Sequence, residues 1–178
     1  ANVESKERKR RPSPPFTTST LQQEAARKLG FSTSRTMKIA QGLYEGVALG
    51  DEGVVGLITY MRTDAVSLSM DAIHELREVI GKDFGPRALP EQPHFYRNKS
   101  KNAQEAHEAI RPTAAAHRPR DIAHFLNDEQ RKLYELIWKR AVASQMQHAT
   151  LNTVSVDLDA GGESMFRASG TTVVDPGF

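Results

Sequence analysis

The sequence contains no cysteine. This excludes disulfide frameworks and thiolate metal sites, and it suits a reducing compartment such as the cytoplasm. No apolar run approaches the roughly 20 residues that a membrane-spanning helix requires, and no signal peptide is visible. Excess charge of one sign is also missing, because the formal net charge is only +2 over 178 residues. Any argument for nucleic-acid binding therefore depends on local clusters of charge.

Several catalytic and metal-binding motifs are incomplete. His107 and Glu108 begin like the zinc-binding HExxH helix motif, but Arg111 stands where the second histidine is needed. Acidic residues within 157–163 could suggest a magnesium site, yet they fall at an expected hairpin turn, where Asp and Gly are common. There is no glycine-rich phosphate loop of the Walker type. We therefore expect no metal ligands in this chain.

What the sequence does contain is mainly a set of helical patterns, with β-type patterns at the two ends. The fold class we predict is mainly α with a small β part. A charged, proline-rich stretch (residues 1–15) is either a nucleic-acid arm or, preferably, a partly extended edge strand or linker. Residues 47–56 are predicted to form a flexible acidic loop, and residues 154–168 a β-hairpin. Helices are predicted at residues 20–29, 34–45, 69–81, 121–126 and from 127 onwards.

Capping residues mark where these helices begin. Thr20 with Gln23, and Asn127 with Gln130, have the spacing of a capping box, and Ser34 precedes the second helix. The first two helices are joined by a short polar turn and resemble a helix-turn-helix. In the last helix, Tyr134 and Trp138 are interpreted as core packing, with base stacking as the alternative.

The stretch with the strongest chemical content is residues 58–64, Ile-Thr-Tyr-Met-Arg-Thr-Asp. In extended backbone Tyr60 and Arg62 would point to the same side. A phenol, with an ordinary pKa of about 10, is a weak nucleophile at neutral pH. A neighbouring guanidinium favours the phenolate and can hold a phosphate oxygen, as attack on a phosphodiester requires. The alternative is a buried strand with a structural tyrosine.

Three segments resemble type IA DNA topoisomerases in the order of that family. Residues 58–64 resemble its active-site segment, residues 15–25 the entry into the tyrosine-bearing domain, and residues 105–113 its histidine segment. The methionine at position 61 resembles the bacterial topoisomerase I branch of the family, which has methionine at this position. Ala65 departs from the serine that most members carry, which puts a minor hydrogen bond in doubt.

The resemblance implies roles for individual residues. Tyr60 would become joined to the 5′ phosphate of a cut single strand, and Arg62 would activate it and hold phosphate. His107 and Arg111 would contact DNA phosphate, although Arg111 could instead fix the loop through Glu105 or Glu108. Asp64 would orient Arg62 or cap the following turn.

The resemblance also implies an organisation in domains. Residues 1–18 would end a β-rich arch domain, residues 19–147 would form a helical tyrosine domain with a helix-turn-helix-like core, and residues 148–178 would return to the arch. Magnesium would be bound in a separate toprim domain, so this piece would be inactive alone. The partners would be single-stranded and supercoiled duplex DNA, without ATP, in the cytoplasm at the nucleoid.

Two other interpretations stay open at this point. One is a non-catalytic helix-turn-helix module that binds DNA, in which Tyr60 is structural. The other is a tyrosine recombinase or type IB topoisomerase, which also combines Tyr, Arg and His. Chain order disfavours the second, because those enzymes usually place the tyrosine after the Arg and His residues.

Overall fold

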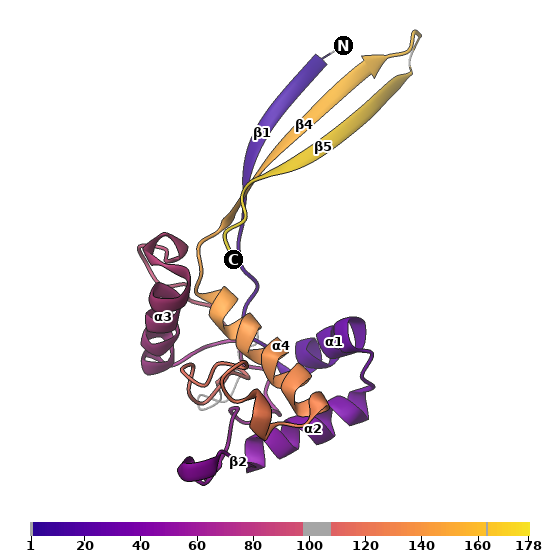
Figure 1. Cartoon of the computed structure of the whole chain (residues 1–178). Helices are drawn as coiled ribbons and strands as arrows, with labels where there is room; N and C mark the ends of the chain where they lie inside the picture. The colour runs from indigo at the N-terminus through magenta and orange to yellow at the C-terminus, as the bar shows by residue number, and fades with distance from the viewer. Residues whose placement is uncertain (1, 98–107, 163) are drawn as a thin grey trace.

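The structure, a computed structural model, describes residues 2–97, 108–162 and 164–178. Within them a helical body carries a long β-ribbon that projects away from it (Figure 1). The described part of the chain holds four α-helices and five strands, so the fold is mixed α/β. The helices of the body are α1 (Thr18–Leu29), α2 (Thr33–Glu45), α3 (Met70–Phe84) and α4 (Asp128–Ser144).

The first two helices begin earlier than the sequence predicted. Thr17, not Thr20, is the N-cap of α1, and Thr20 is its partner in the capping box. Ser32, not Ser34, is the N-cap of α2. Both regions contain runs of Ser and Thr, and the cap falls on the residue whose backbone is extended and whose oxygen can reach the N–H three places on. The predicted stop of α1 at Gly30 is confirmed, with a left-handed φ of 69°.

Helix α4 is the central element of the core. Its predicted capping box of Asn127 and Gln130 is confirmed. Tyr134 is fully buried, and Trp138, which is also buried, donates from its indole nitrogen to the Ala115 carbonyl oxygen (2.9 Å). Core packing is therefore confirmed for both aromatic residues. The base-stacking alternative is wrong for them.

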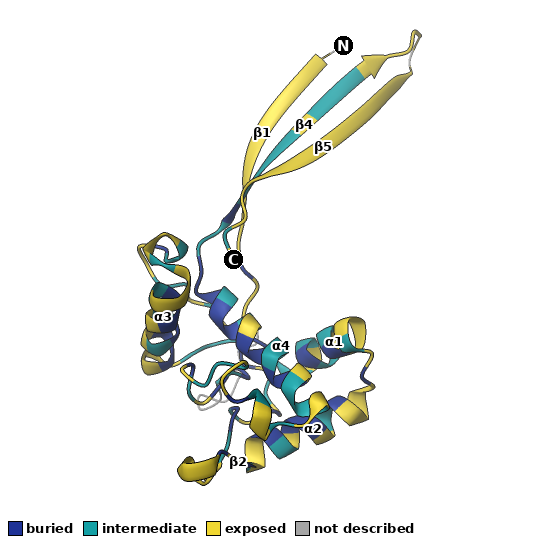
Figure 2. Cartoon of the chain, in the orientation of Figure 1, coloured by how far each residue is buried: buried dark blue, intermediate teal, exposed yellow. Residues whose placement is uncertain are grey.

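The core lies where the helices meet two non-helical segments. Figure 2 shows the buried residues on the inward faces of the helices and along the connecting chain. The largest fully buried side chains are Phe16, Leu21, Leu43, Leu57, Ile58, Ile73, Ile80, Ile110, Leu133, Tyr134, Ile137 and Gln145. Leu57, Ile58 and Ile110 come from irregular backbone, so the core itself anchors the chain on either side of the predicted tyrosine segment.

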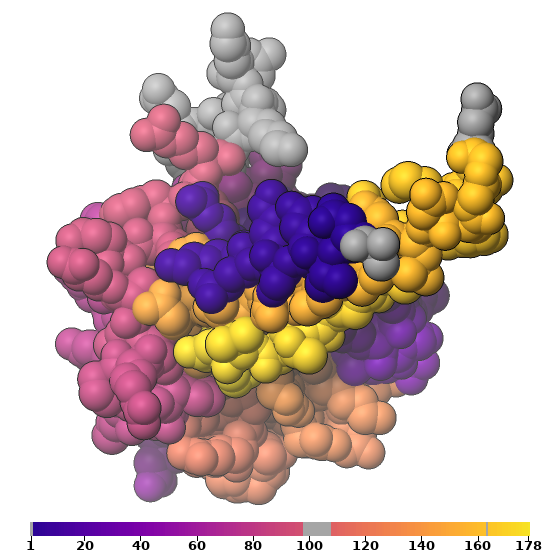
Figure 3. Space-filling view, turned by 90° about the horizontal axis from the view of Figure 1, so that it is seen from above, coloured from indigo at the N-terminus to yellow at the C-terminus, as the bar shows by residue number. Residues whose placement is uncertain are grey.

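The β-ribbon has three antiparallel strands in the order β1-β4-β5. Strand β1 (Asn2–Arg10) pairs with β4 (Ala149–Asp159), which pairs in turn with β5 (Met165–Asp175). In Figure 3 the strands run side by side, β1 in indigo, β4 in orange and β5 in yellow. The predicted edge strand and C-terminal hairpin are confirmed. That the ribbon belongs to a separate arch domain, with boundaries at 18 and 147, stays a prediction.

Residues 47–56 were predicted as a flexible loop, and this is wrong. Strands β2 (Val47–Ala48) and β3 (Val54–Val55) pair around a 3₁₀ turn (Gly50–Glu52). The glycines that suggested a loop are what permits the tight hairpin, since Gly50 and Gly53 have φ of 61° and 74°. The predicted short helix near residue 121 is a 3₁₀ turn (Ala123–Phe125).

Candidate active site

The segment that carries Tyr60 is an irregular loop, not the extended strand expected from its sequence. The backbone bends at Thr59, Met61 and Arg62, and its only ladder contact is an isolated bridge between Ile58 and Pro112. Burial still alternates along it: Met61 and Ala65 point into the protein, whereas Tyr60, Arg62 and Asp64 are exposed. The three polar side chains of interest therefore all reach the surface.

The N-terminus of α1 holds this loop from one side. The Thr18 hydroxyl donates to the carbonyl oxygen of Met61 (2.7 Å) and accepts from the N–H of Thr63 (2.9 Å). The Thr18 N–H donates to the Thr63 carbonyl oxygen (2.9 Å). Because Thr17 is the cap of α1, the Thr18 side chain is free to bind the loop. One residue thus fixes the backbone on both sides of Arg62.

A second segment, residues 109–113, holds the start of the loop. The N–H of Thr59 donates to the Arg111 carbonyl oxygen (2.9 Å), and the Thr59 hydroxyl donates to that of Ala109 (2.7 Å). The N–H of Thr113 donates to the Leu57 carbonyl oxygen (3.0 Å). The N–H of Ile110 donates to the Phe16 carbonyl oxygen (2.8 Å). The three segments that resemble the topoisomerase family in sequence are thus joined directly by backbone hydrogen bonds.

An aromatic pair lies beside the loop. The rings of Tyr44, near the end of α2, and Tyr60 meet edge to face, with centroids 5.3 Å apart and planes at 66°. Gly56 permits this approach, since a Cβ there would lie 2.7 Å from the Tyr44 carbonyl oxygen. The N–H of Leu57 donates to the Leu43 carbonyl oxygen (2.7 Å). The end of α2 therefore sets the position of Tyr60, and no motif in the sequence indicates this role for Tyr44.

Tyr60 itself is available for chemistry. Its side chain is 42% exposed, and its hydroxyl has no hydrogen-bond partner within residues 2–97, 108–162 and 164–178. Arg62 and Asp64 form no ion pair in that same part of the chain. The predicted contact by which Asp64 orients Arg62 is therefore not made among the described residues. Both groups face solvent, open to a ligand.

Arg111 is engaged within the protein. Its guanidinium donates to the Glu108 carboxylate (2.7 and 3.1 Å), whose other oxygen accepts from the N–H of Ser69, the N-cap of α3 (2.6 Å). Burial alone would raise the pKa of Glu108, but the Ser69 hydrogen bonds and the charge of Arg111 outweigh it and lower the pKa. The interpretation in which Arg111 fixes the loop is the one that the geometry supports. The predicted site residue His107 lies outside the described residues.

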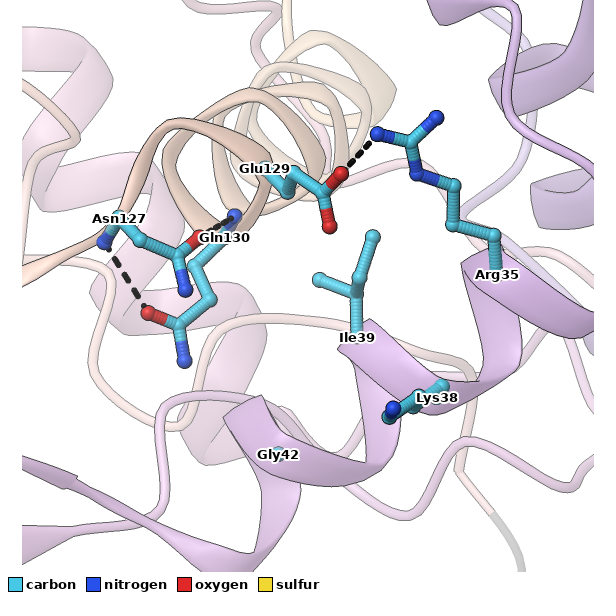
Figure 4. Close-up of a pocket in the computed structure, with 7 residues that line it drawn as sticks. All are labelled: Arg35, Lys38, Ile39, Gly42, Asn127, Glu129 and Gln130. Carbon is cyan, nitrogen blue, oxygen red and sulfur yellow. Dashed lines mark hydrogen bonds and ion pairs between the residues drawn. The ribbon is translucent and has the colours of Figure 1, made fainter.

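A pocket of about 330 Å³ lies elsewhere, between α2 and the start of α4 (Figure 4). Arg35 and Glu129, which face each other across it, form an ion pair, and Asn127 and Gln130 are bound in the capping box. None of the predicted site residues lines it. Most of its polar groups already have partners, so it is not the site that the sequence indicates.

The described residues contain no cluster of three or more His, Asp or Glu side chains that could hold a metal ion. We therefore assign no residue of this chain to magnesium, and the expectation that the metal binds in another domain stays a prediction. In the same part of the chain, no helix is long and apolar enough to cross a membrane.

The comparisons with known proteins agree with this geometry. The family model described as DNA topoisomerase matches residues 1–178. The chain belongs to the bacterial type IA DNA topoisomerases. DNA topoisomerase 1 of Xylella fastidiosa (strain 9a5c) is 66% identical over 177 residues, which are 99% of this chain and 22% of that protein. DNA topoisomerase 1 of Rickettsia bellii (strain RML369-C) is 54% identical over the same shares of the two chains.

A solved topoisomerase structure is similar as well. Full-length topoisomerase I from Thermotoga maritima superposes with a TM-score of 0.84 at 41% identity, covering 99% of this chain and 28% of that one. The chain thus spans between 22% and 28% of the length of these topoisomerases. Similarity over this share of the length shows the family of the chain, whereas the activity of the whole enzyme is a proposal.

Proposed function

We propose that this chain is the tyrosine-bearing part of a DNA topoisomerase that cuts one strand through a 5′-phosphotyrosine link. The observation that carries the proposal is Tyr60, an exposed hydroxyl on a loop whose backbone is held on both sides. A nucleophile must be reachable and must be kept in a productive geometry. A surface tyrosine on a loose loop would meet only the first of these requirements.

Attack of the Tyr60 oxygen on phosphorus forms the Tyr–phosphate ester and breaks the bond to the 3′ oxygen of the neighbouring nucleotide, which leaves with a proton as a 3′ hydroxyl. Resealing reverses these bond changes, so the phosphodiester's energy is kept and no ATP is needed. Relaxation of negative supercoils would follow when a second strand passes through the break. Magnesium, supplied by the toprim domain, would offset phosphate charge.

Arg62 is proposed as the partner of the scissile phosphate. It is exposed two residues from Tyr60, and Thr18 fixes the carbonyl of Met61 and the N–H of Thr63 on either side of it. A guanidinium can hold two phosphate oxygens at once through its planar fork of donors. His107 and Asp64 are proposed as further DNA contacts, whereas Arg111 acts through the loop that it fixes. We place the enzyme in the cytoplasm, at the nucleoid.

The test is to trap a labelled single strand on the full-length enzyme after denaturation. Tyr60→Phe, which removes only the hydroxyl, should abolish the adduct while DNA binding and folding persist. Arg62→Lys keeps the charge but loses the fork, so the cleavage rate should fall by about 100- to 1000-fold, the range that loss of one stabilising donor produces.

The controls separate the alternatives that the sequence left open. Tyr44→Phe removes the hydroxyl of the neighbouring ring, and this variant should still form the adduct. A full-yield adduct in Tyr60→Phe would show that another residue of the full-length enzyme is the nucleophile, and would favour a non-catalytic DNA-binding role for this chain. An adduct through a 3′ phosphate would indicate the recombinase or type IB class instead. That the 178-residue chain is inactive alone stays a prediction.

A further inference from the structure

A basic groove runs along the side of the helical body, between the C-terminal half of α1, α4 and the base of the ribbon. Its volume is about 610 Å³, and among the described residues that line it two are acidic, Glu24 and Glu135. Six cationic side chains contribute to it: Arg10, Arg27, Lys28, Lys132, Lys139 and Arg140. The whole chain carries a net charge of only +2. The described lining of the groove therefore has a clear excess of cationic over acidic side chains.

The cations of the groove are mostly presented to solvent. The side chains of Arg27, Lys28 and Lys139 are 71%, 55% and 68% exposed, although each pairs with a groove carboxylate. The carboxylates are less exposed, at 14% for Glu24 and 36% for Glu135, but Glu24 is shared by Arg27, Lys28 and Arg140, so one negative charge faces three positive ones. Arg10 and Lys132 are exposed and form no ion pair within the described ranges. Most of the positive charge is thus available to a ligand.

Arg140 has a different role. Its guanidinium lies over the Phe16 ring, 4.3 Å from the centroid, and burial lowers its pKa. It also approaches Glu24 at 3.6 Å and donates to the Pro14 carbonyl oxygen at 3.4 Å. Arg140 therefore braces the floor of the groove and joins α4 to the chain that leads into α1. It is not a suitable position for a test of binding.

Ordinary helix chemistry accounts for part of this charge only. Arg27 and Lys28 lie in the last turn of α1, where cations interact favourably with the helix dipole. Lys132 lies in the first turns of α4, where a cation gains nothing from the dipole, and Lys139 lies seven residues later, two turns on along the same helix. Arg10 comes from the end of β1. Three separate elements thus deliver cations to one concave surface.

We propose that this groove binds the phosphate backbone of duplex DNA, at a site separate from Tyr60. The inference rests on the proposed function for the choice of DNA as the polyanion. Lysine and arginine contact phosphates without reading bases. A single strand is usually held by stacking on aromatic rings, and Phe178 is the one aromatic residue among the described residues of the lining. In a duplex the bases already stack on one another, so a duplex can be bound without aromatic side chains.

The position of the groove allows both sites to be used together. Thr18, at the first turn of α1, holds the Tyr60 loop, whereas the groove takes Glu24 to Lys28 from the other end of the helix. At about 1.5 Å per residue, Thr18 and Lys28 are about 15 Å apart along the axis. A strand at the tyrosine loop and a duplex in the groove would therefore contact opposite ends of α1.

The test measures binding of a blunt-ended fluorescent duplex to the chain at several salt concentrations, without magnesium. The double variant Lys132→Ala/Lys139→Ala should bind more weakly. The slope of log K against log salt should become shallower by about 2, because each lost phosphate contact contributes about 0.9. The variant Lys132→Arg/Lys139→Arg should restore the slope. A control, Lys82→Ala/Arg120→Ala, makes the same charge change on exposed side chains outside the groove and should leave the slope unchanged.

Two outcomes would overturn the inference. One is that Lys132→Ala/Lys139→Ala, at equal thermal stability, binds the duplex with the same dependence of log K on log salt as the unchanged chain. The other is that the same variant weakens the binding of a single strand as much as it weakens the binding of the duplex. The proposed function is tested separately. The Tyr60 adduct can be absent while the salt dependence of duplex binding still depends on the groove, and the adduct can form while that salt dependence is the same in the groove variants.

Discussion

Thr18 offers the sharpest test of how the Tyr60 loop is held. Replacing it with Val keeps the shape of the side chain and removes its hydroxyl. The Met61 carbonyl then loses its donor at 2.7 Å, and the Thr63 N–H loses its acceptor at 2.9 Å. The Thr63 carbonyl keeps the Thr18 N–H at 2.9 Å. The cap of α1 is unaffected, since Thr17 supplies it.

The size of the effect follows from these two groups. Each hydrogen bond contributes about 0.5–1.5 kcal/mol net, and both groups are at the edge of the core, where water replaces a partner poorly. We expect a loss of about 2 kcal/mol in the free energy of unfolding. For a domain of this size that corresponds to about 4–8 °C in Tm. A loop that moves by about 1 Å would slow DNA cleavage about 100-fold.

The assay compares Thr18→Val with Thr18→Ser, which keeps the hydroxyl. In the full-length enzyme, the Val variant should form the covalent adduct slowly while its Kd for single-stranded DNA stays near that of the unchanged enzyme. The Ser variant should cleave at close to the original rate. If Val and Ser variants cleave equally fast, the Thr18 hydroxyl does not position the loop. If the Val variant loses binding and cleavage in parallel, its effect is general unfolding.

Two further substitutions test the supports of the loop. Gly56→Ala places a Cβ 2.7 Å from the Tyr44 carbonyl oxygen and should lower stability by about 1–3 kcal/mol in thermal melting, whereas Gly42→Ala, with no neighbour nearer than 3.9 Å, should raise it by about 0.5–1 kcal/mol. Equal and small changes at both glycines would contradict this. The pKa of Glu108 is lowered in the folded state, so its contribution to stability is present above about pH 4.5 and is lost as the pH falls below. Glu108→Gln should thus be less stable than the unchanged chain at pH 7, and the difference in unfolding free energy should shrink as the pH falls below about 4.5. A difference that is constant with pH would exclude the carboxylate's charge as the cause.

Local chemistry in the sequence predicted the regular elements well. The buried face of α3 and the capping box of α4 follow from spacing alone, because both depend on residues within four positions of each other. The start of α1 was misplaced because Thr17 and Thr20 are both good caps and only the backbone angles distinguish them. The β2–β3 hairpin was missed because four residues of strand carry too little periodicity to be recognised.

The sequence indicates which residues to propose for the site, but not how the fold holds them. Tyr60 and Arg62 stand out as a chemical pair two residues apart, whereas the groups that hold them are distant in sequence. Thr18 lies more than 40 residues before the loop, and Arg111 about 50 after it. No periodicity connects such positions, since each contact depends on the path of the whole backbone. Arg111 shows the consequence: the sequence left it divided between DNA and Glu108, and only the fold reveals the 2.7 Å pair.

The basic groove and the tyrosine loop also differ in how strongly each is built into the fold. Thr18 and the carbonyls of Ala109 and Arg111 bind the loop through the backbone, so the loop can move only if α1 or the 109–113 segment moves with it. The groove cations are side chains on the surfaces of α1 and α4, and most can be changed without disturbing the core. Because both sites share α1, a displacement of that helix on binding duplex DNA would be transmitted through Thr18 to the backbone around Arg62. The cleavage rate of groove variants, measured with and without bound duplex, would therefore show whether the two sites are coupled through α1.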